Sequence, residues 1–225
     1  VVIGAGFVGT KAALALRHWG IAVTIVELLK WIVPQQFDAV AGEIFHAALR
    51  AEGIEMLFRR GVLRITRRRG KIQSVSLDDG IRLPADLVVV AVGVKPNADL
   101  ARDAGIVTHR GVLVNARLET SAPDIYAAGD VVMVETEGVI TGEAAVGGIW
   151  TNAVAMGHVA GENMAGGMRE YTGALSVLNA TDLVGIPVVA VGVINPRAGR
   201  GYEVHASRDG TVYRKLVFRD DALVG

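Results

Sequence analysis

The stretch Val1-Val2-Ile3-Gly4-Ala5-Gly6-Phe7-Val8-Gly9 decides the fold of this chain. An apolar run is followed directly by glycines in the spacing GxGxxG, and the apolar residues of 7–19 then recur at helical intervals, with Val8, Ala12, Ala15, Leu16 and Trp19 near one face. A strand that turns on glycines into a helix is typical of a βαβ unit that binds a dinucleotide. The motif alone is a weak signal, because a glycine-rich loop without a ligand has the same pattern.

Each glycine of the motif has a mechanical task in such a unit. Gly4 permits the tight turn, Gly6 lets the backbone approach a pyrophosphate, and Gly9 lets the helix pack closely on the strand. Phe7 and Val8 begin the helix, whose N-terminus offers unpaired N–H groups and about half a positive charge. We therefore expect the pyrophosphate at this loop.

The next strand supports this assignment and indicates the nucleotide. Residues 23–26 form an apolar run that ends at Glu27, at the spacing of roughly 20 residues that the motif requires. A carboxylate accepts hydrogen bonds from ribose hydroxyls and repels a 2′-phosphate, whereas an NADPH site usually has an arginine nearby. Lys30 is the only nearby cation, so the sequence favours NAD(H). An acid at this place also ends the second strand of FAD sites, and the loop alone does not separate the two.

The rest of the chain reads as an α/β protein. Apolar residues make up 51% of it and aromatic residues only 5%, as in parallel sheets that are covered on both faces. Up to Pro96 we expect a helix at 38–51 and strands at 54–58 and 87–92. Between these two strands we expect an antiparallel meander with strands at 62–66, 72–77 and 81–83. Beyond Pro96 we expect helices at 99–104 and 147–165, and strands at 112–114, 125–127, 202–207 and 212–218. Breaks at Lys95-Pro96-Asn97 and Gly166-Gly167 divide the chain into residues 1–97, 98–167 and 168–225.

Composition excludes several classes of function. The formal net charge is zero, so no overall field attracts nucleic acid or an anionic membrane. The chain has no cysteine, and its five histidines are scattered, so we expect no metal site. The apolar run 183–194 is interrupted by glycine and proline and is too short to span a membrane. The basic run 67–71 is interpreted as a solvated hairpin tip, with docking of an acidic partner as the minority alternative.

Three segments resemble the FAD-dependent pyridine nucleotide-disulfide oxidoreductase family, in particular its NADH-dependent rubredoxin, ferredoxin and nitrite reductases and NADH oxidases. They are residues 1–9 with 23–27 and Pro34…Asp38, then 85–97 (ADLVVVAVGVKPN), and then 120–130 (TSAPDIYAAGD). The resemblance implies a Rossmann-like NAD(H)-binding domain with a β-meander in residues 1–97. It also implies part of an FAD-binding domain in 98–167 and the start of a small β-rich interface domain in 168–225.

The resemblance further implies two cofactors, NAD(H) and FAD, and additional site residues. Asp130, after Gly129, would hydrogen-bond the flavin's ribityl chain near its pyrophosphate. Trp150 opens a helix that faces the flavin ring and would pack on the isoalloxazine, with plain core packing almost as good an explanation. Val92 and Gly93 would lie beside the nicotinamide ribose. The chain offers no residue that we assign as an acid–base or nucleophilic catalyst.

Two features depart from the family pattern. Lys11 stands where the family often has a glutamate, which leaves any role of that glutamate in doubt. The chain also begins inside a strand, without the FAD domain's own glycine loop, and ends within the last domain, so we expect a fragment of a longer protein.

The sequence thus predicts part of an NADH-dependent flavoprotein oxidoreductase. It would pass hydride from NADH to FAD and electrons on to an acceptor protein or small molecule, such as an iron–sulfur protein, rubredoxin, nitrite, a disulfide or oxygen. The alternative is a non-catalytic NAD(H)-binding module for redox sensing or assembly. We expect a cytoplasmic protein with an uncovered apolar face after Gly167, where a homodimer would form.

Overall fold

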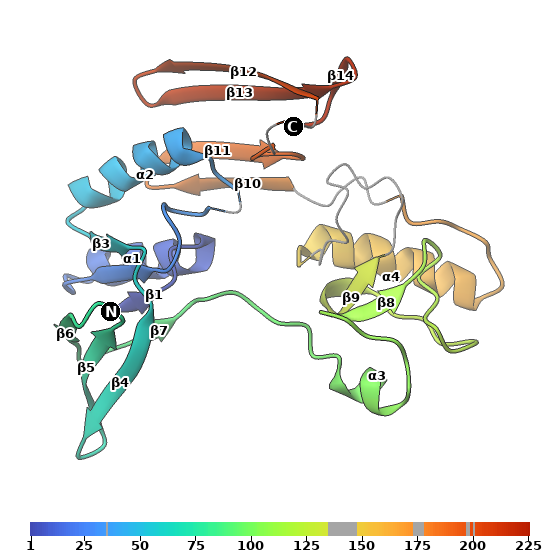
Figure 1. Cartoon of the computed structure of the whole chain (residues 1–225), viewed down its shortest axis with the longest axis horizontal. Coiled ribbons are helices and arrows are strands. Elements are labelled where there is room, and N and C mark those ends of the chain that lie inside the picture. The colour runs from blue at the N-terminus through green and yellow to red at the C-terminus, as the bar shows by residue number, and fades with distance from the viewer. Residues whose placement is uncertain (35, 135–147, 173–177, 197–198, 200) are drawn as a thin grey trace.

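The computed structural model describes the chain except for residues 35, 135–147, 173–177, 197–198 and 200 (Figure 1). An α/β unit begins the chain, and an extended link at residues 91–98 leads from it to a second unit around α4. The chain then returns to the first unit, where β-hairpins lie over its α2 helix. This confirms the predicted fold class.

A parallel sheet forms the centre of the first unit, in the order β3-β2-β1-β7. Its strands are β1 (Val2–Ile3), β2 (Thr24–Glu27), β3 (Glu55–Phe58) and β7 (Val89–Val90). The predicted strand at 87–92 is shorter in the structure, where Val89 and Val90 pair with Val2 and Ile3 of β1. The chain passes from β1 to β2 on one side and reaches β7 on the other side of β1.

Two helices complete the first unit: α1 (Phe7–His18) and α2 (Ala39–Ala51). The predicted apolar face of α1 is not its buried face, since Val8 is 74% and Trp19 is 83% exposed. The helix instead buries Gly9, Thr10 and Ala13. Small residues let its backbone approach the sheet closely, while Phe7, Leu14 and Leu16 of the helix pack half-buried against the same core.

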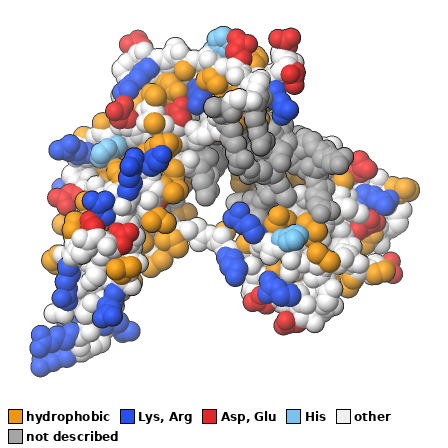
Figure 2. Space-filling model, viewed as in Figure 1, with side chains coloured by type: hydrophobic (Ala, Val, Ile, Leu, Met, Phe, Trp, Pro, Cys, Tyr) orange, Lys and Arg blue, Asp and Glu red, His pale blue; other side chains and the backbone are white. Residues whose placement is uncertain are grey.

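The meander is antiparallel, as predicted, with β4 (Val62–Arg68), β5 (Lys71–Leu77) and β6 (Arg82–Pro84). Its apolar side packs with the far face of the sheet in a cluster that includes Val26, Val75 and Leu77. The β4–β5 tip projects from the body, and basic side chains gather on it (Figure 2). Arg67, Arg68 and Arg69 are exposed there, as expected of a solvated tip.

The second unit holds α3 (Asp99–Asp103), β8 (Val112–Val114), β9 (Val132–Val134) and α4 (Trp150–Met164). Strands β8 and β9 pair in parallel and form a sheet separate from the first. The strand predicted at 125–127 is wrong: Tyr126 forms only an isolated bridge to Glu119. Asp124 has a φ of 61°, a left-handed conformation that interrupts extended chain. Helix α4 begins three residues later than predicted, and the predicted start at Gly147 lies outside the described residues.

Two antiparallel units follow in the C-terminal part. Strand β10 (Leu178–Leu183) pairs with β11 (Ile186–Val191). Strand β13 (Val212–Arg219) pairs with β12 (Tyr202–Asp209) on one side and with β14 (Ala222–Leu223) on the other. Leu183 is fully buried against the first unit, whereas Val189 is 70% exposed. Val191, Leu216 and Leu223 are exposed as well, so apolar side chains lie on the surface of this part. That they form a face which needs a cover stays a prediction. Within the described ranges, no helix is long and apolar enough to cross a membrane.

Candidate functional site

The carboxyl end of β1 is where the parallel sheet opens. Its neighbours β2 and β7 are reached by chain connections that leave in opposite directions. At such a point the loops after adjacent strands separate and leave a crevice, which is the usual ligand site of open parallel sheets. The glycine loop at residues 4–9 lies there, between β1 and α1.

The three glycines of the loop differ in what surrounds them. Gly4 has a φ of +102°, and a side chain on it would collide with the carbonyl oxygen of Ala91 after β7. A side chain on Gly9 would collide with the carbonyl oxygen of Gly4. Gly6 alone faces open space, with nothing within 4 Å of a Cβ built on it. Gly4 and Gly9 are therefore needed for packing, whereas Gly6 leaves room for something outside the chain.

The first turn of α1 borders this open space. Gly6 is the N-cap residue of α1, and no side chain in the described part of the chain caps the helix. The first hydrogen bond of the helix runs from the backbone N–H of Thr10 to the carbonyl of Gly6. The amides of Phe7 and Val8 precede it and have no protein acceptor among the described residues, because no earlier turn of helix offers them a carbonyl. Free amides and the positive end of a helix form a site for a phosphate group.

Glu27 ends β2 next to the loop and is only 9% exposed. Its Oε2 accepts a hydrogen bond of 2.7 Å from the backbone N–H of Ala5, and its Oε1 accepts one of 2.8 Å from the N–H of Leu29. A carboxylate has about four acceptor positions, so further donors remain possible. The predicted nucleotide-binding acid is thus within the site, and it already holds the loop.

On the other side of β1, Val92 and Gly93 follow β7. The backbone nitrogen of Val92 is 3.3 Å from where a Cβ on Gly4 would lie, so this segment borders the loop. The side chain of Val92 is 68% exposed. Gly93 has a φ of +88° and open space around it.

The other predicted residues lie in the second unit. Gly129 has a φ of +82° and, with Asp130, forms a single turn of 3₁₀ helix before β9. Asp130 is exposed, and Gly129 lies against the first turn of α4, where the Cβ of Ala153 is 3.5 Å from a Cβ built on it. Trp150 begins α4 and is 78% exposed, so it is not a core residue in this chain. Within the described residues no side chain caps α4, and the fully buried amide group of Asn152 has no partner.

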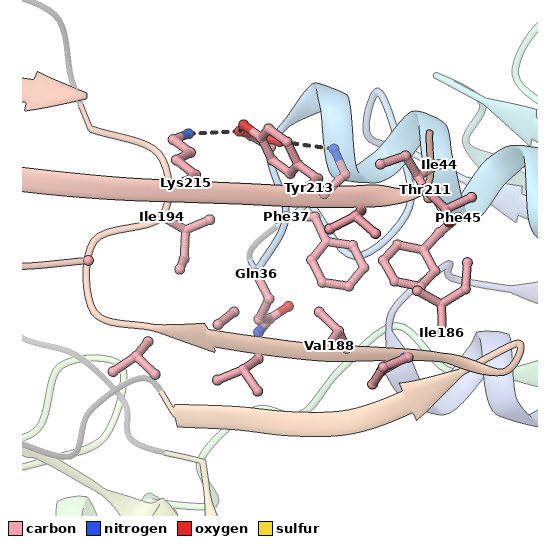
Figure 3. Close-up of a pocket in the computed structure, with 18 of the residues that line it drawn as sticks. Gln36, Phe37, Ile44, Phe45, Ile186, Val188, Ile194, Thr211, Tyr213 and Lys215 are labelled. Atoms are coloured by element: carbon pink, nitrogen blue, oxygen red, sulfur yellow. Dashed lines mark hydrogen bonds and ion pairs between the residues drawn. The ribbon is translucent and has the colours of Figure 1, made fainter. Parts of the chain in front are cut away.

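The clearest pocket lies elsewhere. It has a volume of about 400 Å³ and lies between the start of α2 and strands β11 and β13 (Figure 3). Phe37, Phe45, Ile186 and Val188 line it. None of its described lining residues belongs to the glycine loop, so we do not assign the dinucleotide to it despite its size.

A half-buried polar cluster borders this pocket. Asp38 caps α2 by accepting from the N–H of Ala41 at 3.0 Å, and its Oδ2 accepts from Tyr213 Oη at 2.7 Å and Lys215 Nζ at 2.8 Å. Burial alone would raise the pKa of Asp38, but the hydrogen bonds from Ala41, Lys215 and Tyr213 outweigh it and hold the pKa below its usual value. The polar groups satisfy one another, and the cluster joins α2 to β13.

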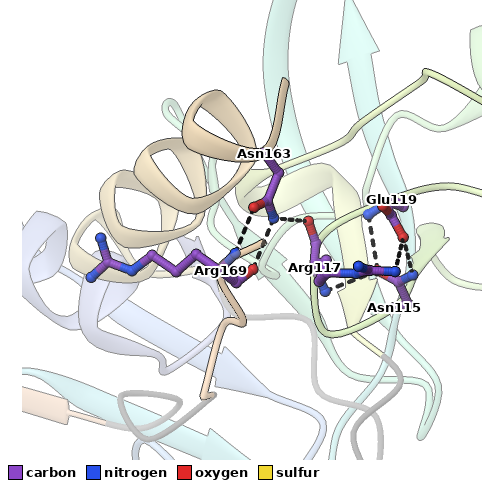
Figure 4. A network of polar contacts seen from close by, with 5 residues as sticks. All are labelled: Asn115, Arg117, Glu119, Asn163 and Arg169. Carbon is purple, nitrogen blue, oxygen red and sulfur yellow. Dashed lines mark hydrogen bonds and ion pairs between the residues drawn. The ribbon is translucent and has the colours of Figure 1, made fainter. Parts of the chain in front are cut away.

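Another polar network, drawn in Figure 4, fixes the end of α4. The amide nitrogen of Asn163 donates to the carbonyl oxygens of Arg117 and Arg169, both at 2.8 Å, and its Oδ1 accepts from the N–H of Arg169 at 2.7 Å. Asn115 fastens the same turn by accepting from the N–H groups of Arg117 and Glu119. This network is structural, because all its bonds are made within the chain.

Sequence reasoning finds the glycine loop and Glu27 but misses the contacts that hold them. The role of Ala5 has no signal, since a backbone amide is not visible in a residue pattern. The orphaned Asn152 and the partners of Asp38 are missed as well. Asp38 before an apolar helix is a recognisable cap, but its partners Tyr213 and Lys215 are distant in sequence.

Comparison with known proteins finds that the chain is similar to oxidoreductases. The sequence model of the family described as pyridine nucleotide-disulphide oxidoreductase matches residues 1–157. The chain is 33% identical to an assimilatory nitrate reductase electron transfer subunit of Bacillus subtilis, over 100% of this chain and 28% of that protein. It is 32% identical to an NADH-dependent phenylglyoxylate dehydrogenase subunit epsilon of Aromatoleum evansii, over 100% of this chain and 53% of that protein.

Solved structures agree. A ferredoxin reductase from Rhodopseudomonas palustris superposes with a TM-score of 0.85 at 28% identity, covering 99% of this chain and 54% of that one. An FAD-dependent pyridine nucleotide-disulphide oxidoreductase from Desulfovibrio vulgaris gives 0.84 at 31% identity, covering 96% and 55%. The chain thus spans about half the length, or less, of the relatives that it matches.

Proposed function

Because this chain belongs to the pyridine nucleotide-disulphide oxidoreductase family, we propose that it is the NADH-binding part of a flavoprotein that takes hydride from NADH and passes electrons to an acceptor. The observation that carries the proposal is the glycine loop, where Gly6 leaves open space in front of the free amides of α1. These features fit a pyrophosphate that bridges two nucleotides.

The chain's residues divide the dinucleotide between two sides of the loop. We propose that Glu27 takes the adenosine ribose on the β2 side, while Val92 and Gly93 border the nicotinamide half on the β7 side. Glu27 would repel a 2′-phosphate, and its neighbours Leu28 and Leu29 offer no cation to receive one. NADH is therefore the proposed donor rather than NADPH.

The second unit fits an FAD contact. Asp130 exposes a strong acceptor at the turn before β9, and the N-terminus of α4 is uncapped within the described residues beside the exposed Trp150. We propose that Gly129 and Asp130 hold the ribityl and pyrophosphate region, and that Trp150 covers the ring. When bound, FAD supplies the two-electron acceptor for hydride, and the chain's contribution is to orient the nucleotides.

The acceptor beyond the flavin is proposed by class only. The relatives include an electron transfer subunit and a ferredoxin reductase by name, which favours a redox protein as the partner. No residue of the described chain is assigned to the acceptor.

Anaerobic addition of NADH to the longer flavoprotein of which we expect this chain to be a part, with its FAD bound, tests this proposal. We expect the flavin's visible absorption band to bleach stoichiometrically with NADH, and less readily with NADPH. Binding of NADH without bleaching would contradict the oxidoreductase and favour a sensing or assembly module.

A further inference from the structure

The contacts of Glu27 point beyond ribose recognition. Both carboxylate oxygens are already engaged, with Ala5 N–H at 2.7 Å and Leu29 N–H at 2.8 Å. The side chain is only 9% exposed, so these are charge-assisted bonds in a place with little water. Such bonds are stronger than those between neutral groups and fix the two backbone segments relative to each other.

Ala5 is held from two directions, by the last residue of β2 and by the segment that follows this strand. Its N–H donates to Glu27, and its carbonyl oxygen accepts from the N–H of Val33 at 2.9 Å. Ala5 and Val33 are both fully buried. Val33 reaches this position with a φ of 47°, which is unfavourable for a β-branched residue. Both backbone polar groups of Ala5 are therefore occupied by the chain itself.

The bond to Glu27 directs the Ala5 amide into the protein and away from the crevice. With the Ala5 amide turned toward Glu27, the loop presents the side of Gly6 and the first turn of α1 to the crevice. If the Glu27 carboxylate were absent, the Ala5 N–H would lose its acceptor in a buried place, and the loop would relax to find another. A relaxed loop would no longer hold its donors in place for a phosphate.

We propose that Glu27 is a positioning residue of the phosphate-binding loop, and that it controls dinucleotide affinity through the Ala5 amide as well as through the ribose. This rests on the proposed function for the identity of the nucleotide. The hold on the loop itself exists without any nucleotide.

The first test uses NADH and an NADH analogue that lacks the 2′- and 3′-hydroxyls of the adenosine ribose. Glu27→Ala is expected to weaken the analogue by roughly tenfold or more, the scale of one charge-assisted hydrogen bond, because the loop loses its hold on Ala5. It is expected to weaken NADH by a larger factor, because the bonds to the ribose hydroxyls are lost as well. Glu27→Gln keeps the shape and one acceptor oxygen, so a smaller loss with both is expected. Glu55→Gln alters an exposed acid on β3 and is the matched control, with no change expected. If Glu27→Ala binds the analogue as tightly as the unmodified chain does, Glu27 acts through the hydroxyls alone and the proposal is wrong.

The second test needs no nucleotide. Amide hydrogen exchange is measured at Ala5 and at Ile25, a buried residue of β2, in the unmodified chain and in Glu27→Gln. We expect faster exchange at Ala5 with Ile25 unchanged, which separates a local release from a loss of overall stability. Equal exchange at Ala5 in both proteins, or equal acceleration at both sites, would overturn the proposal. An unmodified chain that binds no NADH would refute the proposed function, while the exchange rates would still decide whether Glu27 holds Ala5.

Discussion

Gly6 is the position where folding and nucleotide binding can be separated by one methyl group. Its φ of −70° and ψ of 177° suit an alanine, and a Cβ there meets nothing within 4 Å. Gly6→Ala is therefore expected to change the free energy of unfolding by only about 0.5 kcal/mol in either direction. A small loss as an N-cap residue opposes a small gain from a less flexible unfolded chain.

The same methyl group would occupy the space that a pyrophosphate needs. Backbone N–H groups bond phosphate oxygens at roughly 2.7–3.2 Å between heavy atoms, a distance that leaves no room for an intervening carbon. Losing one such charge-assisted bond costs about 1.5–3 kcal/mol, or roughly ten- to a hundredfold in the dissociation constant for NADH. Calorimetric titration with NADH and urea denaturation of the same samples measure the two effects.

Gly9→Ala provides the contrast. A side chain there collides with the backbone carbonyl of Gly4, which cannot move without displacing the loop. We expect a loss of about 1–3 kcal/mol in stability, as for other overpacked sites. The reasoning is refuted if Gly6→Ala keeps its NADH affinity within about twofold, or if it destabilises the chain as much as Gly9→Ala does.

The remaining predictions concern the parts of the chain around the site. Asp38→Ala removes a helix cap and leaves the half-buried Lys215 without its partner, so urea denaturation is expected to show a loss of about 1–3 kcal/mol. Folding lowers the pKa of Asp38, so the ionised carboxylate stabilises the folded chain above the unfolded pKa of 3.8, and this stabilisation is lost as the pH falls. Below about pH 5 the free energy of unfolding of the unmodified chain is therefore expected to fall faster than that of Asp38→Asn. The same pH dependence in both proteins would exclude this. Asn163→Ala leaves the carbonyl of Arg117 without its donor, and a loss of about 1–3 kcal/mol is expected in denaturation, whereas a neutral result would mean that water replaces the amide. The purified 225-residue chain contains a single GxGxxG loop, so it is expected to bind NADH yet show no stoichiometric flavin band in its visible spectrum.

Much of the first unit follows from its sequence. The periodicity of apolar residues and the spacing of glycines are local properties of the sequence, so the residue pattern alone is enough to place β1, α1, β2 and the meander. The length of β7 is less predictable, because its pairing partner β1 is far away in the chain. The buried side of α1 is hard to predict for a similar reason. The hydrophobicity of Trp19 predicts burial, but the residue is 83% exposed, and the fully buried positions of the helix are small or short residues such as Gly9 and Ala13.

The candidate site shows the same limit. Gly4, Gly6, Gly9 and Glu27 are a local motif, and the structure gathers them at one edge of the sheet. The contacts that hold the loop depend on backbone amides, which a pattern of side chains does not report. The pairing of Asp38 with Lys215 spans 177 residues, so only the folded chain brings the two together.

The central claim is that the glycine loop and Glu27 form an NADH site, and a pair of calorimetric titrations tests it most directly. The unmodified chain is titrated with NADH and, separately, with NADPH at the same salt concentration. The account predicts saturable binding of NADH and binding of NADPH that is weaker by about tenfold or more, because the 2′-phosphate would lie against the Glu27 carboxylate. Equal or tighter binding of NADPH, or no binding of NADH, would contradict it.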